Sequence, residues 1–402
     1  MFRFGKYLER TMKDMAAECV GLVLNDADIK KEDLQFAYVS NGYWGLFEGQ
    51  HSIKGQVLLF PLGIQKIPIT NVENACAGAS TAFHLAWMSV ASGLYDVGLA
   101  LGVEKLTHVD KELSLKSFMS SMDVLDFENQ IGRMLSAGET LSVKPPADQA
   151  AAGKGRSIFM DMYAVGARWH MSKYGTTQRQ LAVISAKNHF HSTFNPLAQI
   201  QKDMTVEEVL ADKLISYPLT RPMCAPIGDG ATAAILCCDD YLKKLSNPRP
   251  VKIRASVLGS GTDRGLEGED IGERLSRKAY EIASVGPEDI DVAEVHDATA
   301  FGELHQTEAL GFCPEGEGGI FAESGATKLG GKLPINTSGG LESRGHPIGA
   351  SGMAQIHEIV TQLRGEAGNR QVSGACLGLT ENGGGTLGFE EAAMTIHLFE
   401  KI

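Results

Sequence analysis

The sequence predicts an α/β protein in which helices cover the faces of β-sheets. Strand-like and helix-like segments alternate along most of the chain. With 402 residues, the chain is long enough to form two cores rather than one. Two distant stretches also share a Gly-Ala-Ser sequence at the start of a helix-like run, which indicates two related halves.

Periodicity and neighbouring turn residues assign the elements in order. The expected strands lie at 34–42, 96–105, 251–261, 289–299 and 332–340, and the expected helices lie at 79–93 and 351–365. The shared Gly-Ala-Ser occurs in "NACAGASTAFHLAWMSVASG" and again in "GHPIGASGMAQIHEIVTQLRG". We therefore expect an N-terminal half over residues 1–245 and a C-terminal half over residues 246–402.

One segment, from about residue 113 to residue 167, breaks the alternation. It contains "PPADQAAAGKGRS", with methionines on both sides of that stretch. Long connections with adaptable apolar side chains often cover binding sites, so an inserted loop region over a site is one interpretation. A helical loop without ligand contacts is the other.

Composition excludes several classes of protein. The net charge of −12 argues against a nucleic-acid partner and against a membrane surface, because both require a basic face. No stretch is long and apolar enough to span a bilayer, and the N-terminus has no secretory pattern. The seven cysteines have no CxxC spacing, so we expect no disulfide framework, no bound metal and a reducing, cytoplasmic location.

Two residues at the helix starts are candidates for chemistry. Cys76 lies where a strand-like stretch becomes an apolar helix, and the N–H groups of a helix start favour a thiolate. The alternative is a buried cysteine that fills space. His346, in "ESRGHPIGASG", lies on a rigid turn before the second helix and is a candidate base for a thiol. On its own, His346 is more typical of a histidine that caps its own turn.

Two further polar sites follow strand-like stretches. His296, in "VAEVHDATAFGEL", lies at the strand end where α/β folds collect their sites. Glu381 precedes Gly383 in "LTENGGGTLG", and such glycines let backbone N–H groups approach a ligand closely, as an oxyanion hole requires. Ordinary loop and turn residues are the alternative for each.

Together these motifs resemble the thiolase superfamily, in particular the branch of archaeal and sterol-carrier-protein-type thiolases. "NVENACAGAS" resembles the nucleophile motif, "VHDAT" the His-Asp-Cys-Phe motif, and "NTSGGLESRGHPIGASG" the Gly-His-Pro motif. "KNHFHSTFNPLAQ" and "APIGDGATA" are also similar to segments of this branch. The resemblance implies two βαβαβαββ halves of five strands each, stacked as an αβαβα sandwich that normally forms a homodimer.

The resemblance also implies roles for single residues. Cys76 matches the cysteine that takes the acyl group from a 3-oxoacyl thioester. His346 matches the histidine that activates this cysteine and donates to the thioester oxygen, and His296 matches the position that completes this oxyanion hole through a water. The N–H groups of Cys76 and Gly383 match the other oxyanion hole.

The chain departs from the branch pattern in three places. Ala298 stands where the His-Asp-Cys-Phe motif has cysteine, and Glu381 stands where other thiolases have the acid/base cysteine. Burial raises the pKa of a glutamate toward neutrality, and related synthases use a glutamate as acid/base, so we expect Glu381 to take that role. The short apolar strand that usually precedes a segment like "MFRFGKYLE" does not stand before it in this sequence, so either one sheet lacks a strand or the start codon has been placed late.

The resemblance implies a thiolase that cleaves or forms a 3-oxoacyl-CoA through an acyl-Cys76 intermediate, with coenzyme A as co-substrate and no permanently bound cofactor. A thiolase-like retro-aldolase acting on a side-chain CoA ester and a non-catalytic subunit of a complex are the alternatives. Retention of Cys76 opposes the first, and the intact set of Cys76, His346 and His296 opposes the second.

The substrate and the partner are less constrained. A bulky or aromatic acyl chain, such as that of benzoylsuccinyl-CoA, suits a pocket lined by Trp44, Phe47, Phe118, Phe127 and Phe159. Many members of this branch work with a small partner protein that carries a zinc-ribbon and an OB-like domain, and we expect such a partner here.

Overall fold

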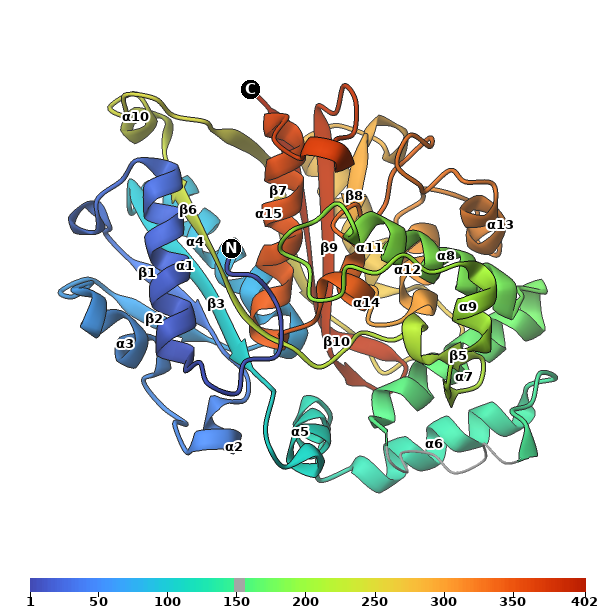
Figure 1. Ribbon diagram of the computed structural model, residues 1–402. Helices are drawn as coiled ribbons and strands as arrows, with labels where there is room; N and C mark the ends of the chain where they lie inside the picture. The colour runs from blue at the N-terminus through green and yellow to red at the C-terminus, as the bar shows by residue number, and fades with distance from the viewer. Residues whose placement is uncertain (148–155) are drawn as a thin grey trace.

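The computed structural model describes residues 1–147 and 156–402, so residues 148–155 of the predicted insertion lie outside the description. Two β-sheets alternate with three layers of helices, which confirms the predicted α/β class and five-layered arrangement (Figure 1). The middle layer contains helices α4 (Gly78–Ala91) and α15 (Ser351–Arg364), which contact each other. The 3₁₀ turns that precede these two helices are also in contact, so the two Gly-Ala-Ser segments meet at the centre of the molecule.

The first sheet is formed by N-terminal strands. Its order is β2 (Ile69–Val72), β1 (Ala37–Ser40), β3 (Val97–Lys105) and β6 (Asp229–Cys237). β1 runs parallel to both neighbours, whereas β6 runs antiparallel to β3. Helices α1 (Met12–Ala27) and α3 (Lys54–Leu59) pack on the strands of this sheet. The strands predicted at 34–42 and 96–105 are confirmed, as is the helix predicted at 79–93.

The second sheet is formed by C-terminal strands. Its order is β7 (Val251–Ser260), β10 (Glu390–Lys401), β9 (Leu377–Leu387) and β8 (Val292–Glu294). β8 runs parallel to β9, and β10 runs antiparallel to both of its neighbours. Helix α11 (Ile271–Ala283) packs on β7 and β10. The strand predicted at 251–261 and the helix predicted at 351–365 are confirmed, and the strand predicted at 289–299 is reduced to β8.

The strand predicted at 332–340 is wrong. Ile335 makes a single parallel bridge to Ala293, and the next residue, Asn336, has a φ of 55°. This left-handed conformation ends an extended segment. The first sheet has a similar single bridge, between Gly5 and Asp229. Each of these two sheets therefore has four strands among the described residues, with one bridge where the resemblance implied a fifth strand, and β4 and β5 form a separate two-stranded sheet.

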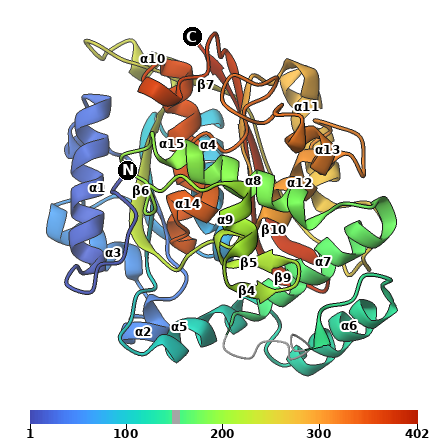
Figure 2. The same ribbon diagram turned by 45° about the vertical axis from the view of Figure 1, so that its right-hand side comes forward.

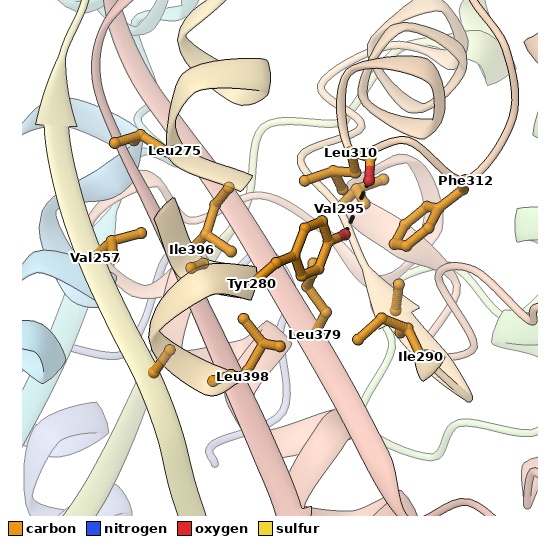
Figure 3. Close-up of a cluster of buried hydrophobic side chains, with 14 of the residues drawn as sticks. Val257, Leu275, Tyr280, Ile290, Val295, Leu310, Phe312, Leu379, Ile396 and Leu398 are labelled. Atoms are coloured by element: carbon orange, nitrogen blue, oxygen red, sulfur yellow. Dashed lines mark hydrogen bonds between the residues drawn. The ribbon is translucent and has the colours of Figure 1, made fainter. Parts of the chain in front are cut away.

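The C-terminal half has an apolar core between α11 and the second sheet (Figure 3). Leu275 and Tyr280 of α11 belong to the same buried cluster as Ile396 of β10 and Leu379 of β9. The Tyr280 hydroxyl donates a hydrogen bond to the backbone oxygen of Leu310 at 2.9 Å, so this buried phenol is satisfied. This packing fixes the position of β9. The glycines of β9, Gly383 to Gly385, line a cavity that is described below.

The insertion between β3 and β6 is longer than predicted and mostly helical. It contains α5 (Lys111–Ser117), α6 (Phe127–Thr140), α7 (Ile158–Tyr174), α8 (Gln178–Ser192), α9 (Val206–Ala211), β4 (Leu214–Ser216) and β5 (Leu219–Thr220). The remaining short helices are α2 (Trp44–Glu48) and α10 (Asp239–Leu242).

The insertion packs on the C-terminal half (Figure 2). Its helix α8 contacts α12 (Ala300–Ala309), α13 (Gly318–Glu323) and α14 (Gly340–Arg344), and α7 also contacts α12. This placement favours the interpretation of the insertion as a cover over a site. Within residues 1–147 and 156–402, no helix combines the length and the apolar character needed to cross a bilayer.

Candidate active site

A cavity of about 1030 Å³ lies between the insertion and the C-terminal half, and Cys76, His296 and His346 all line it. Its apolar wall comes largely from the insertion and from the second half, through Phe118, Phe159, Met160, Met162, Phe301 and Phe389. Phe118 and Phe159 are two of the five aromatic residues expected there. The other three pack elsewhere: Trp44 in the N-terminal core, Phe127 in the cluster between α6 and α7, and Phe47 beside Leu106.

Cys76 lies in the 3₁₀ turn Ala75–Ala77, immediately before α4. Its sulfur is 3.3 Å from Nε2 of His346, although the two residues come from different halves of the chain. Small neighbours make this approach possible. At Gly384, for example, a Cβ atom would lie 2.4 Å from the backbone nitrogen of Ala77, so any side chain there would displace the turn that carries Cys76.

The hydrogen bonds of His346 determine which of its ring nitrogens carries the proton. Nδ1 lies 2.7 Å from Oγ of Ser351, the first residue of α15. The Ser351 hydroxyl donates its own proton to the backbone oxygen of Pro347 at 2.9 Å, so its oxygen accepts from Nδ1–H. Nε2 is therefore unprotonated and faces the Cys76 thiol as an acceptor.

His296 has the opposite tautomer. The side-chain amide of Asn382 donates to Nδ1 of His296 at 2.9 Å. The hydroxyl of Ser80 lies 2.7 Å from the amide oxygen of Asn382 and 3.0 Å from the backbone oxygen of Ala77. Because Nδ1 is an acceptor, Nε2 carries the proton. The rings of His296 and His346 lie 5.3 Å apart between centroids and nearly perpendicular, at 81°. The site therefore has one imidazole that accepts and one that donates.

Burial keeps all three groups neutral. It raises the pKa of Cys76 to about 12, and the opposing hydrogen bonds from backbone N–H groups are smaller in effect. Burial also lowers the pKa of His296 to about 3 and that of His346 well below its usual range. The expectation that the helix start makes a resting thiolate at Cys76 is therefore wrong, because loss of solvation outweighs the helix dipole. The resting pair is a thiol facing a neutral imidazole.

The glycine run of β9 supplies a backbone donor to the sulfur. The backbone N–H of Gly385 is directed at Cys76, as is the N–H of Cys76 itself. Gly383, which the resemblance assigned to the oxyanion hole of the acyl group, lines the cavity two residues earlier in the strand. Gly385 has a φ of 63°, which kinks the strand and turns its N–H toward the nucleophile.

Glu381 lies behind the cavity wall. Its Oε2 accepts a hydrogen bond from the backbone N–H of His296 at 2.8 Å, and its side chain has no exposed surface. Its other oxygen, Oε1, has no partner among the described residues, and burial raises its pKa well above the usual range. Glu381 does not line the cavity, whereas Asp212, Glu342, Glu390 and Glu391 do.

Cys76, His296 and His346 also form a group that is close enough, within 4.8 Å between donor atoms, to hold a metal ion. A sulfur and two imidazole nitrogens suit Zn²⁺. However, a ligating nitrogen needs a free lone pair, and Nε2 of His296 carries a proton because Asn382 donates to Nδ1. This arrangement favours hydrogen-bond donation from His296 over coordination of a cation.

Sequence reasoning assigned no role to three residues of this site, Ser351, Asn382 and Gly385. Each lies inside a motif that was recognised, Ser351 at the end of "GHPIGAS" and the other two in "LTENGGGTLG". The sequence did contain a signal for such residues, because a histidine that acts as a base needs a hydrogen-bond partner at its second ring nitrogen. The sequence does not say which neighbouring residue supplies it.

Comparison with known proteins identifies relatives along nearly the whole chain. The sequence family described as "Thiolase, N-terminal domain" matches residues 2–240, and "Thiolase C-terminal domain-like" matches residues 271–396. The acetyl-CoA acetyltransferase of Methanothermobacter thermautotrophicus is 38% identical over 404 residues, which cover 99% of this chain and 97% of that protein. Sterol carrier protein 2 of Bos taurus is 37% identical, with 96% and 70% covered. The benzoylsuccinyl-CoA thiolase subunit BbsB of Thauera aromatica is 36% identical, with 84% and 80% covered.

Solved structures with the same fold are more distant in sequence. The Ltp2-ChsH2(DUF35) aldolase superposes with a TM-score of 0.77 at 22% identity, covering 98% of this chain and 94% of that one. Human mitochondrial 3-ketoacyl-CoA thiolase in complex with CoA superposes with a TM-score of 0.70 at 14% identity, covering 100% and 96%. At these identities the likeness establishes the fold alone.

Proposed function

This chain belongs to the thiolase family, and we propose that it cleaves or forms 3-oxoacyl-CoA thioesters through an acyl group carried on Cys76. One observation carries the proposal. The Cys76 sulfur lies 3.3 Å from an imidazole nitrogen that is free to accept its proton, because the other nitrogen of His346 donates to Ser351. A thiol that is neutral at rest and paired with a base becomes a nucleophile only when it attacks.

The first half-reaction transfers the acyl group to the enzyme. As the Cys76 sulfur bonds to the 3-oxo carbon, its proton passes to Nε2 of His346. The bond between C2 and C3 then breaks, and its electron pair moves to C2 and onto the thioester oxygen as an enolate. His346, now protonated, and Nε2–H of His296 both donate to this oxygen, which stabilises the charge where it develops. C2 takes a proton from an acid of the cavity wall, and the shortened acyl-CoA leaves.

The second half-reaction returns the enzyme to its resting state. The coenzyme A thiol loses its proton to a base and attacks the acyl group on Cys76. The oxyanion that forms faces the backbone N–H groups of Cys76 and of the β9 glycines. The Cys76 sulfur leaves and recovers its proton from His346. Two moderate barriers replace one large barrier, which is the advantage of a covalent intermediate.

Basic residues on the cavity wall suit the phosphates of coenzyme A. Arg3, Lys6 and Lys202 line the cavity and make no ion pair with a described acidic residue. Arg156 and Arg221 line it as well but are already paired with carboxylates. We place the phosphates at the three unpaired cations, and Lys202→Ala is expected to raise KM for coenzyme A while leaving kcat unchanged.

We propose that Glu381 is a positioning residue. Its carboxyl holds the backbone N–H of His296 and so fixes the strand end that carries this imidazole. Glu381 also lies close to the place where the resemblance implied an acid/base residue. Its role is tested by Glu381→Gln, which keeps an acceptor for the His296 N–H.

The wide, aromatic-lined cavity supports a bulky acyl chain such as a benzoylsuccinyl group. The relative from Thauera aromatica is named as a subunit of a thiolase, which supports a complex here too, and we propose a homodimer with a small zinc-ribbon and OB-fold partner. Light scattering of the purified chain, alone and co-expressed with that partner, tests the assembly.

The decisive test of the reaction is mass spectrometry of Cys76 after incubation with a panel of 3-oxoacyl-CoAs, from acetoacetyl-CoA to benzoylsuccinyl-CoA. We expect an acyl adduct on Cys76 that coenzyme A removes. A cleavage product that forms without any adduct on Cys76 would favour the retro-aldolase alternative. The absence of both product and adduct with every substrate would favour the non-catalytic alternative.

A further inference from the structure

The reaction needs a second acid/base, and Glu381, which the sequence offered for it, does not line the cavity. Ala298 has no titratable group, and the carboxyl of Glu381 is engaged behind the wall. We propose that Glu391 is the catalytic residue that gives C2 its proton and later takes the proton of coenzyme A. This inference rests on the proposed thiolase function and names a further residue of the same site.

Glu391 reaches the site through the fold of the β9–β10 hairpin. The hairpin pairs Glu391 with Thr386, and the positive φ of Gly385 kinks the strand between them and the nucleophile. As a result, Cγ of Glu391 lies over Gly383, where an added Cβ atom would meet it at 2.7 Å. Gly383 and Gly385 are at most about 7 Å apart along a strand, and Gly385 contacts the Cys76 sulfur. Glu391 therefore lines the same stretch of cavity as the nucleophile.

Tyr163 of α7 supports this placement independently. It lines the cavity and packs beside Gly302, close to the segment that carries His296. The charges of Glu391 and Cys76 both raise the pKa of Tyr163, after burial, so this one phenol is near both groups. Glu391 and Cys76 thus both lie near a single side chain that lines the cavity.

The surroundings of Glu391 leave its carboxyl free for proton transfer. Among the described residues, only its own backbone N–H donates a hydrogen bond to it. The adjacent Glu390 is different, because its carboxyl accepts from the backbone N–H groups of Thr262 and Ile271 and pairs with Arg274. The carboxyl of Glu390 is therefore engaged in structural hydrogen bonds, whereas the carboxyl of Glu391 is available to a substrate.

The charged groups around Glu391 tune its titration. Burial and the carboxylate of Asp270 raise its pKa to about 7, whereas His305 and Arg264 act in the opposite direction. Tyr163 and Glu381 also face it, and burial raises the pKa values of both. A group that is half protonated near neutrality can act as the acid in one half-reaction and as the base in the other.

With Glu391 in this role, each proton that is transferred in the two half-reactions has a donor and an acceptor. In the cleavage step, Glu391 in its acid form gives its proton to C2 of the enolate and becomes a carboxylate. In the thiolysis step, this carboxylate takes the proton from the coenzyme A thiol and returns to the acid form. His346 meanwhile takes the Cys76 proton and returns it. Neither step needs an oxidant, a reductant or a metal.

The test measures exchange of the C2 protons of acetyl-CoA with D₂O and thiolysis of acetoacetyl-CoA, in the parent and in Glu391→Gln. Exchange at C2 reports on the base directly, without cleavage of a carbon–carbon bond. Glu391→Gln is expected to lower both rates by about 10²–10⁴-fold. Alkylation of Cys76 by iodoacetamide is expected to change by less than two-fold, since the thiol and His346 are untouched. Glu381→Gln, the matched change at the neighbouring carboxyl, is expected to lower the same rates by less than ten-fold.

The pH profile gives a second readout. Abstraction of a C2 proton needs the carboxylate form, so the exchange rate of the parent should rise with pH through about 7 and then level off. Glu391→Gln should lack this rise. An exchange rate in Glu391→Gln above one tenth of the parent would overturn the proposal. A larger loss in Glu381→Gln, or an equal loss of Cys76 alkylation in Glu391→Gln, would overturn it as well.

These outcomes are distinct from failure of the proposed function. If Cys76 of the parent is not acylated by acetoacetyl-CoA or by the longer 3-oxoacyl-CoAs, the covalent mechanism is wrong whatever Glu391 does. If Cys76 is acylated and Glu391→Gln keeps its exchange activity, the thiolase function stands and only the assignment of Glu391 fails.

Discussion

The starts of α4 and α15 occupy corresponding places in the two halves but do different chemistry. Both helices have 14 residues, and each follows a 3₁₀ turn that contributes to the middle layer. The turn before α4 carries the nucleophile Cys76 within it. The base His346 instead precedes its turn, and the first residue of α15, Ser351, reaches back to hold its imidazole. The same scaffold thus presents a sulfur on one side and an oriented ring on the other.

This difference shows that each half is chemically incomplete. The start of α4 alone holds a buried thiol whose pKa is raised to about 12, which is unreactive at neutral pH. The start of α15 alone holds a neutral imidazole with nothing to activate. Reactivity arises only where the two turns meet, at 3.3 Å between sulfur and nitrogen. Substitutions on the two sides should therefore differ in which step they affect.

The largest effect is expected on the α4 side. Cys76→Ser should lower acyl transfer by about 10⁴-fold or more, because a serine hydroxyl is a far weaker nucleophile and leaving group. Thiolysis with coenzyme A and mass spectrometry of residue 76 measure the loss. Circular dichroism should show an unchanged fold. Retention of substantial activity would contradict the covalent mechanism.

The next effect lies on the α15 side. His346→Ala removes the base, so it should lower thiolysis by about 10²–10⁴-fold and also slow alkylation of Cys76 at pH 7. Because burial lowers the pKa of His346, alkylation of the parent should lose its rate at a lower pH than it would with an ordinary histidine as base. Alkylation of His346→Ala at the parental rate would mean that the turn before α4 activates the thiol by itself.

Asn382→Asp tests the role of His296, whose imidazole does not lie at the start of α4 or of α15. An aspartate accepts from Nδ1–H of His296, which moves the ring proton away from Nε2 and removes one donor from the oxyanion hole. Loss of one such donor costs about 10²-fold in kcat. Cys76 alkylation should remain close to the parental rate, since the thiol and His346 are unchanged. Full activity in this variant would show that His296 does not donate to the thioester oxygen.

The smallest effect is expected from Ser351→Ala. It removes the acceptor of Nδ1–H but leaves the His346 ring in its packed position, so kcat/KM should fall by about ten-fold. Steady-state kinetics measure the change, with thermal unfolding as a control for stability. A loss as large as that of His346→Ala would mean that Ser351 fixes the position of the ring as well as its tautomer.

The sequence by itself determined the fold class and the identity of the reactive pair. Helix and strand periodicities are local, so the strands around 34–42 and 96–105 and the two central helices were predictable. Cys76 and His346 each lie in a motif at a helix start, and their residue types specify a nucleophile and a base. The resemblance of these motifs, in order along the chain, was enough to predict that they meet.

Only the tertiary structure decided which atoms reach the substrate. Side chains alternate along a strand, so whether Glu381 or Asn382 contacts the His296 imidazole depends on a register that local sequence does not contain. Glu391 lies ten residues from Glu381 and lines the cavity through the pairing of β10 with β9. The charge state of Cys76 was mispredicted for a related reason. A pKa is set by solvation, which depends on how much of the chain packs over the sulfur, and that packing exists only after the two halves and the insertion have come together.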